Sequence, residues 1–211
     1  MNTRFNMKTY YAFIFIIAAL ASSCVGGQLN TPLVYEKNPQ YTWGYAEFFG
    51  DYYYPENKNK NNVLSISLFT DSMKINNLGT LTGLGQFLFL EDVFQAPTDT
   101  VLSTGTYTVN DTGLPFTVAP GKNDTVDHEV YPIGAYISYY ENNAANSTMK
   151  TIKSGSFVVS RTGSVFNITC NFMTSDNMNL NGSFKAILPH INQSVSFPQS
   201  GIRKKLVYTL K

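Results

Sequence analysis

Histidine, cysteine and charged side chains are all scarce in this chain of 211 residues. It contains 2 histidines, 2 cysteines and 14% charged residues, with a formal net charge of +1. A nucleophile–histidine–acid site needs a histidine as its base, and a zinc site needs clustered Cys and His ligands, so neither kind of site is indicated. Because the charges nearly balance, a polyanionic partner is not expected, and we predict no nucleic acid partner.

Long apolar runs are also missing. The longest, Ala12 to Ala21, has about half of the roughly 20 residues that a transmembrane helix needs. Two basic residues precede this run and a pair of serines ends it, which is typical of a secretory signal peptide over residues 1–23. We therefore expect this segment to be removed.

Cys24 stands directly after the predicted signal peptide. The junction LASSC resembles the lipobox of bacterial lipoproteins, in which cleavage leaves the cysteine as a diacylated N-terminus. The resemblance implies lipidation of Cys24, with palmitate as a typical acyl group, and anchoring of the chain in a membrane. Ordinary secretion, with Cys24 trimmed away or bonded to Cys170, is the alternative.

The rest of the chain divides into a tether and one domain. Residues 24–40 contain glycines and prolines without a sustained period and are predicted to be a flexible tether. Residues 41–211 contain many short apolar runs between Gly, Asn, Asp and Pro clusters, which predicts a single all-β domain. We expect about ten strands in an antiparallel β-sandwich, with a closed or flattened β-barrel, lipocalin-like, as the alternative.

Alternation within single runs predicts which side of each strand is buried. In NVLSISLF, leucine and isoleucine alternate with Ser65 and Ser67, so the serine side is expected to face solvent. In VFNITCNF, the residues Phe166, Cys170 and Phe172 share one side with an isoleucine. Cys170 is therefore predicted to be a small buried hydrophobic residue and not a reactive thiol.

One short pattern occurs twice. STGTYTVNDTG is echoed 50 residues later by KSGSFVVSRTG. We expect Gly113 and Gly163 to close hairpins with positive φ, and Gly105 and Gly155 to open strands. A chance likeness of two hairpins is the alternative to a β-unit used twice.

No catalytic residue is predicted. His128 stands between two acidic residues in a polar stretch, and adjacent strand residues point to opposite sides, so no oriented dyad is indicated. His190 has no recognisable partner, and a G-x-S-x-G motif is missing from the sequence. Both histidines are interpreted as structural, and we expect the chain not to be an enzyme.

Two weaker patterns indicate neither a calcium site nor a catalytic pair of acidic residues, and no cofactor is predicted. The run that begins at Asn177 has amides where a calcium loop has carboxylates, and Leu188 occupies the position of its bidentate Glu, so we predict a polar hairpin turn. Glu91 and Asp92 are strand neighbours that point apart, so they are not expected to act together on a glycosidic bond.

The remaining candidate for a site is aromatic. In YTWGYAEFFGDYYYP, alternation would place Tyr41, Trp43 and Tyr45 on one side of a strand and Phe48 on the other. A strand that is aromatic on both sides leaves one side for a ligand or partner, unless both sides are covered. The predicted ligand-binding residues are Trp43, Tyr45, Tyr52, Tyr53 and Tyr54.

Taken together, the lipobox, the Pro/Gly tether, AEFFGDYYY and the repeated G-[TS]-[YF]-x-V-x-x-T-G resemble small outer-membrane lipoproteins of Bacteroidetes. The resemblance implies an all-β module anchored in the cell envelope, with carbohydrate binding as a frequent context. Surface-displayed lipoproteins of this group often have acidic residues just after the cysteine, whereas VGGQLN follows Cys24 here. Both the cell surface and the periplasmic face of the outer membrane therefore stay open.

The same resemblance implies O-glycosylation at Asp followed by Ser or Thr and an apolar residue. Three such sequences occur, and their acceptors are Ser72, Thr100 and Thr125. All three are expected in turns or loops, where a bulky sugar is accommodated.

These observations predict a lipid-anchored, extracytoplasmic binding module of the bacterial envelope. The membrane is contacted through the N-terminal lipid, and the expected ligand is a glycan or another surface ligand. An adhesin or a structural subunit of an envelope protein complex is the alternative.

Overall fold

The computed structural model describes residues 35–51, 61–77, 80–126, 129–140 and 148–194. Its regular structure consists of fifteen strands, and the described residues contain no helix, so the predicted all-β class is confirmed. The ten longer strands are β1 (Gln40–Gly50), β2 (Asn62–Thr70), β5 (Gly85–Gln95), β6 (Gly105–Val109), β8 (Lys122–Val126), β9 (Glu129–Ile133), β10 (Ala135–Tyr140), β11 (Thr148–Thr162), β12 (Val165–Thr174) and β14 (Ser183–Ile187). The five short ones are β3 (Lys74–Ile75), β4 (Leu81–Thr82), β7 (Thr117–Val118), β13 (Asn179–Leu180) and β15 (His190–Asn192).

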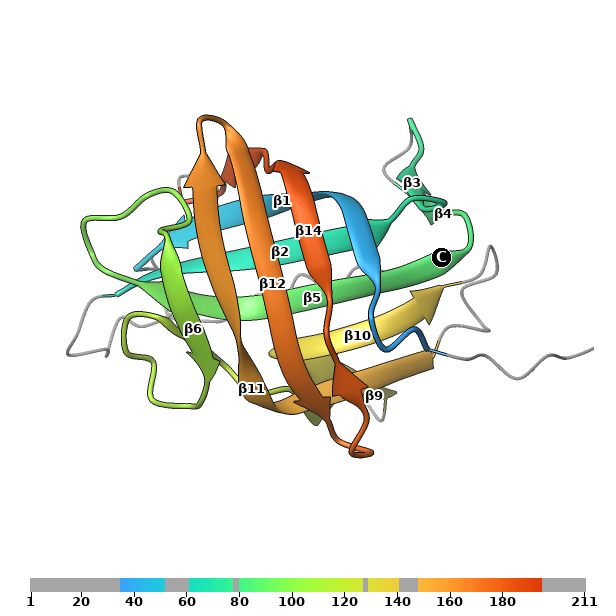
Figure 1. Cartoon of the computed structure of the whole chain (residues 1–211). Coiled ribbons are helices and arrows are strands. Elements are labelled where there is room, and N and C mark those ends of the chain that lie inside the picture. The colour runs from blue at the N-terminus through green and yellow to red at the C-terminus, as the bar shows by residue number, and fades with distance from the viewer. Residues whose placement is uncertain (1–34, 52–60, 78–79, 127–128, 141–147, 195–211) are drawn as a thin grey trace, which may run out of the picture. The chain divides into compact units, whose positions relative to one another are not determined.

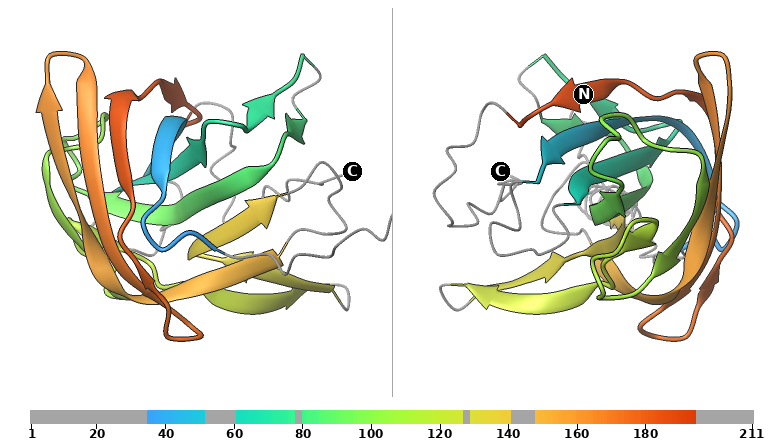
Figure 2. Two further views of the ribbon diagram at one scale, coloured as in Figure 1. Left: turned by 45° about the vertical axis from the view of Figure 1, so that its right-hand side comes forward. Right: turned by 90° about the vertical axis from the view of Figure 1, so that its left-hand side faces the viewer.

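The main sheet closes on itself. Hydrogen-bonded pairing leads from β1 through β2, β5, β10, β11, β12 and β14 back to β1. In Figure 1, β6, β11, β12 and β14 form a front wall that crosses over a back wall of β1, β2, β5 and β10, and Figure 2 shows the same walls from two other sides. The fold is thus a flattened barrel whose walls pack face to face, as the sheets of a sandwich do. Most pairs are antiparallel as predicted, but β1 pairs in parallel with β14 and β15, and β6 with β7.

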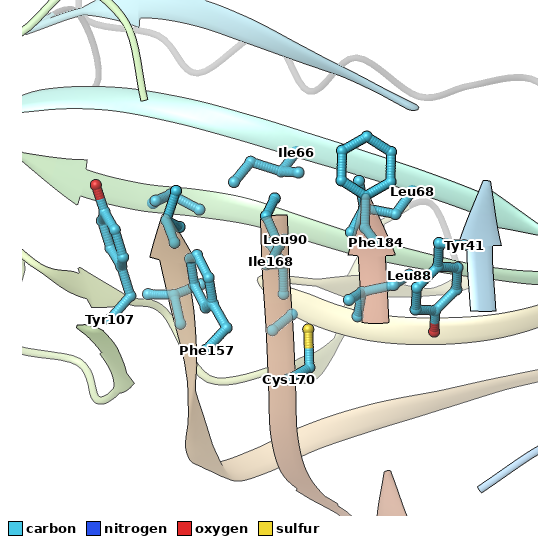
Figure 3. Packing of buried hydrophobic residues seen from close by; sticks show 14 of the residues in the cluster. Tyr41, Ile66, Leu68, Leu88, Leu90, Tyr107, Phe157, Ile168, Cys170 and Phe184 are labelled. Atoms are coloured by element: carbon cyan, nitrogen blue, oxygen red, sulfur yellow. The ribbon is translucent and has the colours of Figure 1, made fainter. Parts of the chain in front are cut away.

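The hydrophobic core lies between the two walls. Figure 3 shows Ile66 and Leu90 of the back wall close to Ile168 of β12 in the front wall. Along β12, buried residues alternate with exposed ones, as the sequence predicted for Cys170 and its neighbours. Each fully buried Leu or Ile of this kind contributes about 1.5–3 kcal/mol to stability.

The repeated glycine pattern has a structural counterpart. Its two copies lie on neighbouring strands, with Tyr107 of β6 directly opposite Phe157 of β11 and the two rings stacked at 4.7 Å. The expected positive φ is present at Gly113 (64°) and Gly163 (61°). Gly163 closes the β11–β12 hairpin as predicted, whereas Gly113 joins strands that run in parallel.

Gly155 departs from the expectation, because it lies inside β11 and does not open it. Its φ is 115°, and a Cβ atom there would stand 2.2 Å from the Asn171 carbonyl oxygen of β12. The register to β12 shifts between Ile152 and Ser154, just before this glycine. Gly155 therefore lets β11 bend, so that one strand pairs with β10 at its start and with β6 further along.

The domain begins earlier than Tyr41. Tyr35 is buried, the Glu36 N–H donates to Gln86 Oε1 (3.0 Å), and the Lys37 carbonyl accepts from the Asn181 N–H (2.7 Å). The prediction of a tether over residues 24–40 is therefore wrong for its end, residues 35–40. Backbone hydrogen bonds of an irregular segment leave no periodic pattern in its sequence, and residues 24–34 lie outside the described residues.

The bend at Gly155 gives a first prediction. Gly155→Ala is expected to lower the free energy of unfolding by about 3 kcal/mol or more, because it adds both backbone strain and a clash with β12. Gly163→Asn is the matched control: its φ suits Asn, and no atom lies within 4 Å of the added Cβ, so a change within about 1 kcal/mol is expected. Urea unfolding of both variants measures this, and equal losses would contradict the role of Gly155.

Candidate functional site

The outer side of the back wall carries large aromatic residues. Alternate residues of the same strands, such as Leu68 and Leu88, belong to the core between the walls, so these aromatic residues point away from it. We call this surface the aromatic face. It consists of Trp43 and Tyr45 of β1, Phe69 of β2, Phe87 and Phe89 of β5, and Tyr136 of β10.

Trp43 is held in place from two directions. Its ring stacks on Phe69 with centroids 4.1 Å apart and an interplanar angle of 12°. Its indole N–H donates to the Met73 carbonyl at 2.8 Å, which ties the strand to the turn after β2. Phe69 in turn contacts Phe87 at 5.8 Å. Such ring pairs add about 0.5–1.5 kcal/mol each beyond burial, so this part of the face is rigid.

A second row crosses all four strands. Tyr45 lies opposite Ser67, Ser67 opposite Phe89, and Phe89 opposite Tyr136. Ser67 is only 3% exposed between these larger neighbours, as is Ser65, so the prediction of a solvated serine side on β2 is wrong. Burial raises the pKa of Tyr136, and the nearby Glu91 and Tyr45 raise it further, which keeps the Tyr136 hydroxyl protonated at neutral pH.

Two carboxylates lie beside the second row. Glu47 accepts hydrogen bonds from Ser65 Oγ and Gln193 Nε2, each at 3.2 Å. Glu91 accepts the Gly134 N–H at 2.6 Å, next to Tyr136. The face therefore combines apolar ring surface with oriented carboxylate and hydroxyl groups, a combination that binds ligands having both apolar and hydrogen-bonding parts.

The outer side of the front wall has a different character. Most of its exposed residues are polar, and they include Thr106 and Thr108 of β6, Ser160 of β11, Asn167, Thr169 and Asn171 of β12, and Ser183 and Lys185 of β14. Two apolar residues are also exposed there, Val158 of β11 (44%) and Ile187 of β14 (61%). Both walls share the same core, which buries the inner residues of their strands. On the outer side of the back wall, by contrast, the rings belong to a second hydrophobic cluster, in which Phe69 is buried and Trp43, Tyr45 and Phe87 are partly exposed.

Two of the residues predicted for ligand binding are placed together. Trp43 and Tyr45 share the aromatic face. Tyr41, which was predicted to share it, is instead 2% exposed in the core, because a β-bulge between Tyr41 and Trp43 reverses the alternation. Tyr52, Tyr53 and Tyr54 lie outside the described residues.

The sequence interpretation missed the other four members of the face, Phe69, Phe87, Phe89 and Tyr136. They lie on three separate strands, which only the sheet topology brings beside β1. A signal was nevertheless present in GQFLFL, where phenylalanine alternates with leucine and both sides of the strand are apolar.

The proposed modification residues fall in different settings. Ser72 is exposed in the turn after β2, and Thr100 is exposed in the loop between β5 and β6. Thr125 is also exposed, but it lies in β8 and not in a loop as predicted. The strand β8 is mainly polar, so its composition did not distinguish it from a loop. Cys24 lies outside the described residues.

His190 makes hydrogen bonds to the backbone through both ring nitrogens. Its Nε2 accepts the Leu102 N–H at 3.0 Å, so the Nδ1–H donates to the Leu188 carbonyl at 2.9 Å and the ring is neutral. Burial lowers the pKa of His190, and the nearby positive charge of Arg161 lowers it further. These contacts give His190 a structural role. His128 lies outside the described residues.

The other sequence patterns also have structural settings. Asn177 sits in the turn between β12 and β13 with φ of 65°, and its side chain accepts a hydrogen bond from Lys153, so the predicted hairpin turn is confirmed. Cys170 is 4% exposed, and burial raises its pKa to about 12, which leaves the thiol unreactive at neutral pH. Within the described residues, no three His, Cys, Asp or Glu side chains gather to hold a metal ion.

The neutral state of His190 predicts a pH dependence. The unfolded chain binds a proton at His190 near pH 6.5, whereas the folded protein resists it, so stability is full above about pH 6.5 and falls as the pH drops below that value. His190→Gln should lose this part of the acid destabilisation, and the control His128→Gln should keep it. Urea unfolding over a series of pH values measures the slopes, and an unchanged slope in His190→Gln would contradict the assignment.

Comparisons with known proteins found no relative of this chain. No protein-family model matches the chain, and searches of curated proteins and of solved structures gave no match. Across the described part of the chain, no helix has the length and apolar character needed to cross a membrane. A proposal about function therefore has to rest on the aromatic face and on the sequence features at the N-terminus.

Proposed function

We propose that the chain is a lipid-anchored, non-catalytic binding module of the bacterial envelope that binds a glycan on its aromatic face. The observation that carries the proposal is the placement of six aromatic residues from four strands on the outer side of the back wall. The lipid anchor is supported by the sequence around Cys24, which places a cysteine directly after a signal peptide pattern.

The chemistry of the aromatic face suits a sugar chain. Sugar rings present C–H surfaces to aromatic rings and hydroxyl groups to acceptors such as the Glu47 and Glu91 carboxylates. Neighbouring strands are about 4.8 Å apart, so the row from Tyr45 to Tyr136 extends over about 14 Å. A row of this length favours an extended ligand of several rings over a single small molecule.

A structural subunit of an envelope complex is the second candidate. The observation in its favour is the β8–β9 hairpin, which forms a sheet of its own and presents Val130, a residue that is 62% exposed. A two-stranded ribbon of this kind offers an edge to which a strand of another protein can pair. Recovery of a stoichiometric protein partner that survives an alkaline wash would favour this second function.

The glycan proposal is tested with a single substitution on the second row. Tyr45→Ala should weaken binding to any glycan that the wild type retains by roughly 10-fold, because one aromatic contact contributes about 1–2 kcal/mol. Thr169→Ala, on the outer side of the front wall, is the matched control and should leave affinity unchanged. A glycan array followed by calorimetry makes the measurement. Equal affinities for both variants, or no bound glycan at all, would overturn the proposal.

The anchor is tested with the two cysteines. Cys24→Ala in the full chain should shift the protein from the membrane fraction to the soluble fraction and remove the lipid from its N-terminal peptide. Cys170→Ala is the control, because this residue lies in the core, and it should leave fractionation unchanged. Fractionation with mass spectrometry of the N-terminal peptide gives the readout, and membrane retention of Cys24→Ala would refute lipid anchoring.

A further inference from the structure

The two walls of the barrel carry charges of opposite sign. Within the described strands of the front wall, β6, β11, β12 and β14, the charged residues are all basic: Lys150, Lys153, Arg161 and Lys185. Within the described strands of the back wall, β1, β2, β5 and β10, they are all acidic: Glu47, Glu91 and Asp92. The turn and the hairpin after β2 add Asp71 and Lys74, one charge of each sign. The outer side of the back wall therefore attracts cations and repels anions.

Of the three acidic residues of the back wall, Glu91 is the most accessible to an external ligand. Glu47 and Asp92 are only 7% and 6% exposed, whereas Glu91 is partly exposed. Leu90, the residue before it in β5, belongs to the core, and Phe89 before that belongs to the aromatic face. Glu91 therefore points outward as well, next to Phe89 on the same side of β5.

The Glu91 carboxylate is held beside a pair of rings. Its Oε2 accepts the Gly134 N–H at 2.6 Å, and the Gly134 carbonyl accepts the Glu91 N–H at 3.3 Å. Gly134 stands shortly before Tyr136, which lies directly opposite Phe89, and these two rings have their centroids 5.3 Å apart. We call Phe89, Glu91 and Tyr136 the Glu91 corner of the aromatic face.

The charge of Glu91 acts on the rings of this corner. Burial raises the pKa of Tyr136, and the nearby Glu91 and then Tyr45 raise it further, so the Tyr136 side chain is neutral at neutral pH. A cation at the corner interacts with the carboxylate and with the electron-rich faces of two rings. An anion meets the same carboxylate, and the described back-wall strands hold no basic residue that would offset the repulsion.

We propose that the Glu91 corner binds a protonated primary amine, so that the aromatic face takes an amino sugar chain with free amino groups. The inference rests on the proposed function and narrows it to one chemical class of glycan. A free amine supplies the cation that the corner attracts, whereas an N-acetyl group removes that charge and keeps the same sugar ring. Uronic acids and sulfated sugars bring negative charge to the acidic wall and are disfavoured.

Two oligosaccharides of equal length and identical linkage test the role of charge. One consists of glucosamine and the other of N-acetylglucosamine, and calorimetry compares them at a pH that keeps the amines protonated. The wild type should bind the glucosamine chain roughly 10-fold more tightly at low ionic strength, because the amine adds a cation–π contact and an ion pair. High salt should reduce this preference, because it screens the attraction of the carboxylate.

Glu91→Gln separates the charge of this residue from its structural contact. The glutamine keeps an oxygen that can accept the Gly134 N–H, while the negative charge is removed. This variant should bind the glucosamine chain severalfold more weakly and keep its affinity for the N-acetylated chain. Asp111→Asn is the matched control, because it removes one negative charge from an exposed bend between β6 and β7, and it should leave both affinities unchanged.

The outcomes distinguish this proposal from the glycan proposal. Equal affinities for the two chains, or an equal loss for both in Glu91→Gln, would overturn the amine assignment, while Tyr45-dependent binding of the N-acetylated chain would still support a glycan site. Binding of a polylysine peptide but of neither sugar chain would overturn both proposals in favour of a protein ligand, and so would the absence of any binding. If Glu91→Gln loses its sheet signal in circular dichroism, the wild-type comparison at low and high salt decides the question.

Discussion

The parallel pairing of β1 with β14 and β15 is the contact on which the rest of the structure depends. It joins Gln40 to Ser183, residues that are 183 − 40 = 143 positions apart in the chain, and it converts an open sheet into a closed circuit. Without it, β1 and β14 would both be open edges, and the core between the walls would lose one side. The entropy of closing so long a loop opposes this pairing, so the closure relies on burial that extends along both walls.

Closure also imposes distortions on individual strands, and these distortions decide which side chains reach the aromatic face. β11 bends at Gly155 to serve both walls, and β1 carries a bulge between Tyr41 and Trp43. The bulge turns Tyr41 into the core and Trp43 outward, although their spacing alone would place them on the same side. The geometry that completes the core is therefore the same geometry that places the tryptophan on the outer surface.

This dependence explains what the sequence could and could not predict. Alternation is a local property, so the all-β class and the burial of Cys170 followed directly from VFNITCNF. A β-bulge interrupts the two-residue alternation of a strand, and no particular residue type in the sequence marks it. The prediction therefore placed Tyr41 on the wrong side of β1. Burial of Ser67 depends on the large residues of two neighbouring strands, and parallel closure depends on segments at opposite ends of the chain. For the same reason, two members of the aromatic face, Trp43 and Tyr45, were found within one strand, while the four contributed by other strands were not.

The structural and the binding interpretations of Trp43 are compatible. Its ring stacks on Phe69, and its N–H is bound to the Met73 carbonyl, so the residue stabilises the turn after β2 whether or not a ligand exists. A ring already fixed in this way loses little conformational entropy when something binds to its remaining surface, whereas a free side chain must first be ordered. The contacts that support a purely structural role for Trp43 therefore also lower the free-energy cost of binding a ligand. What distinguishes the two interpretations is the surrounding surface, where aromatic rings stand in place of the mostly polar residues that the front wall presents to solvent.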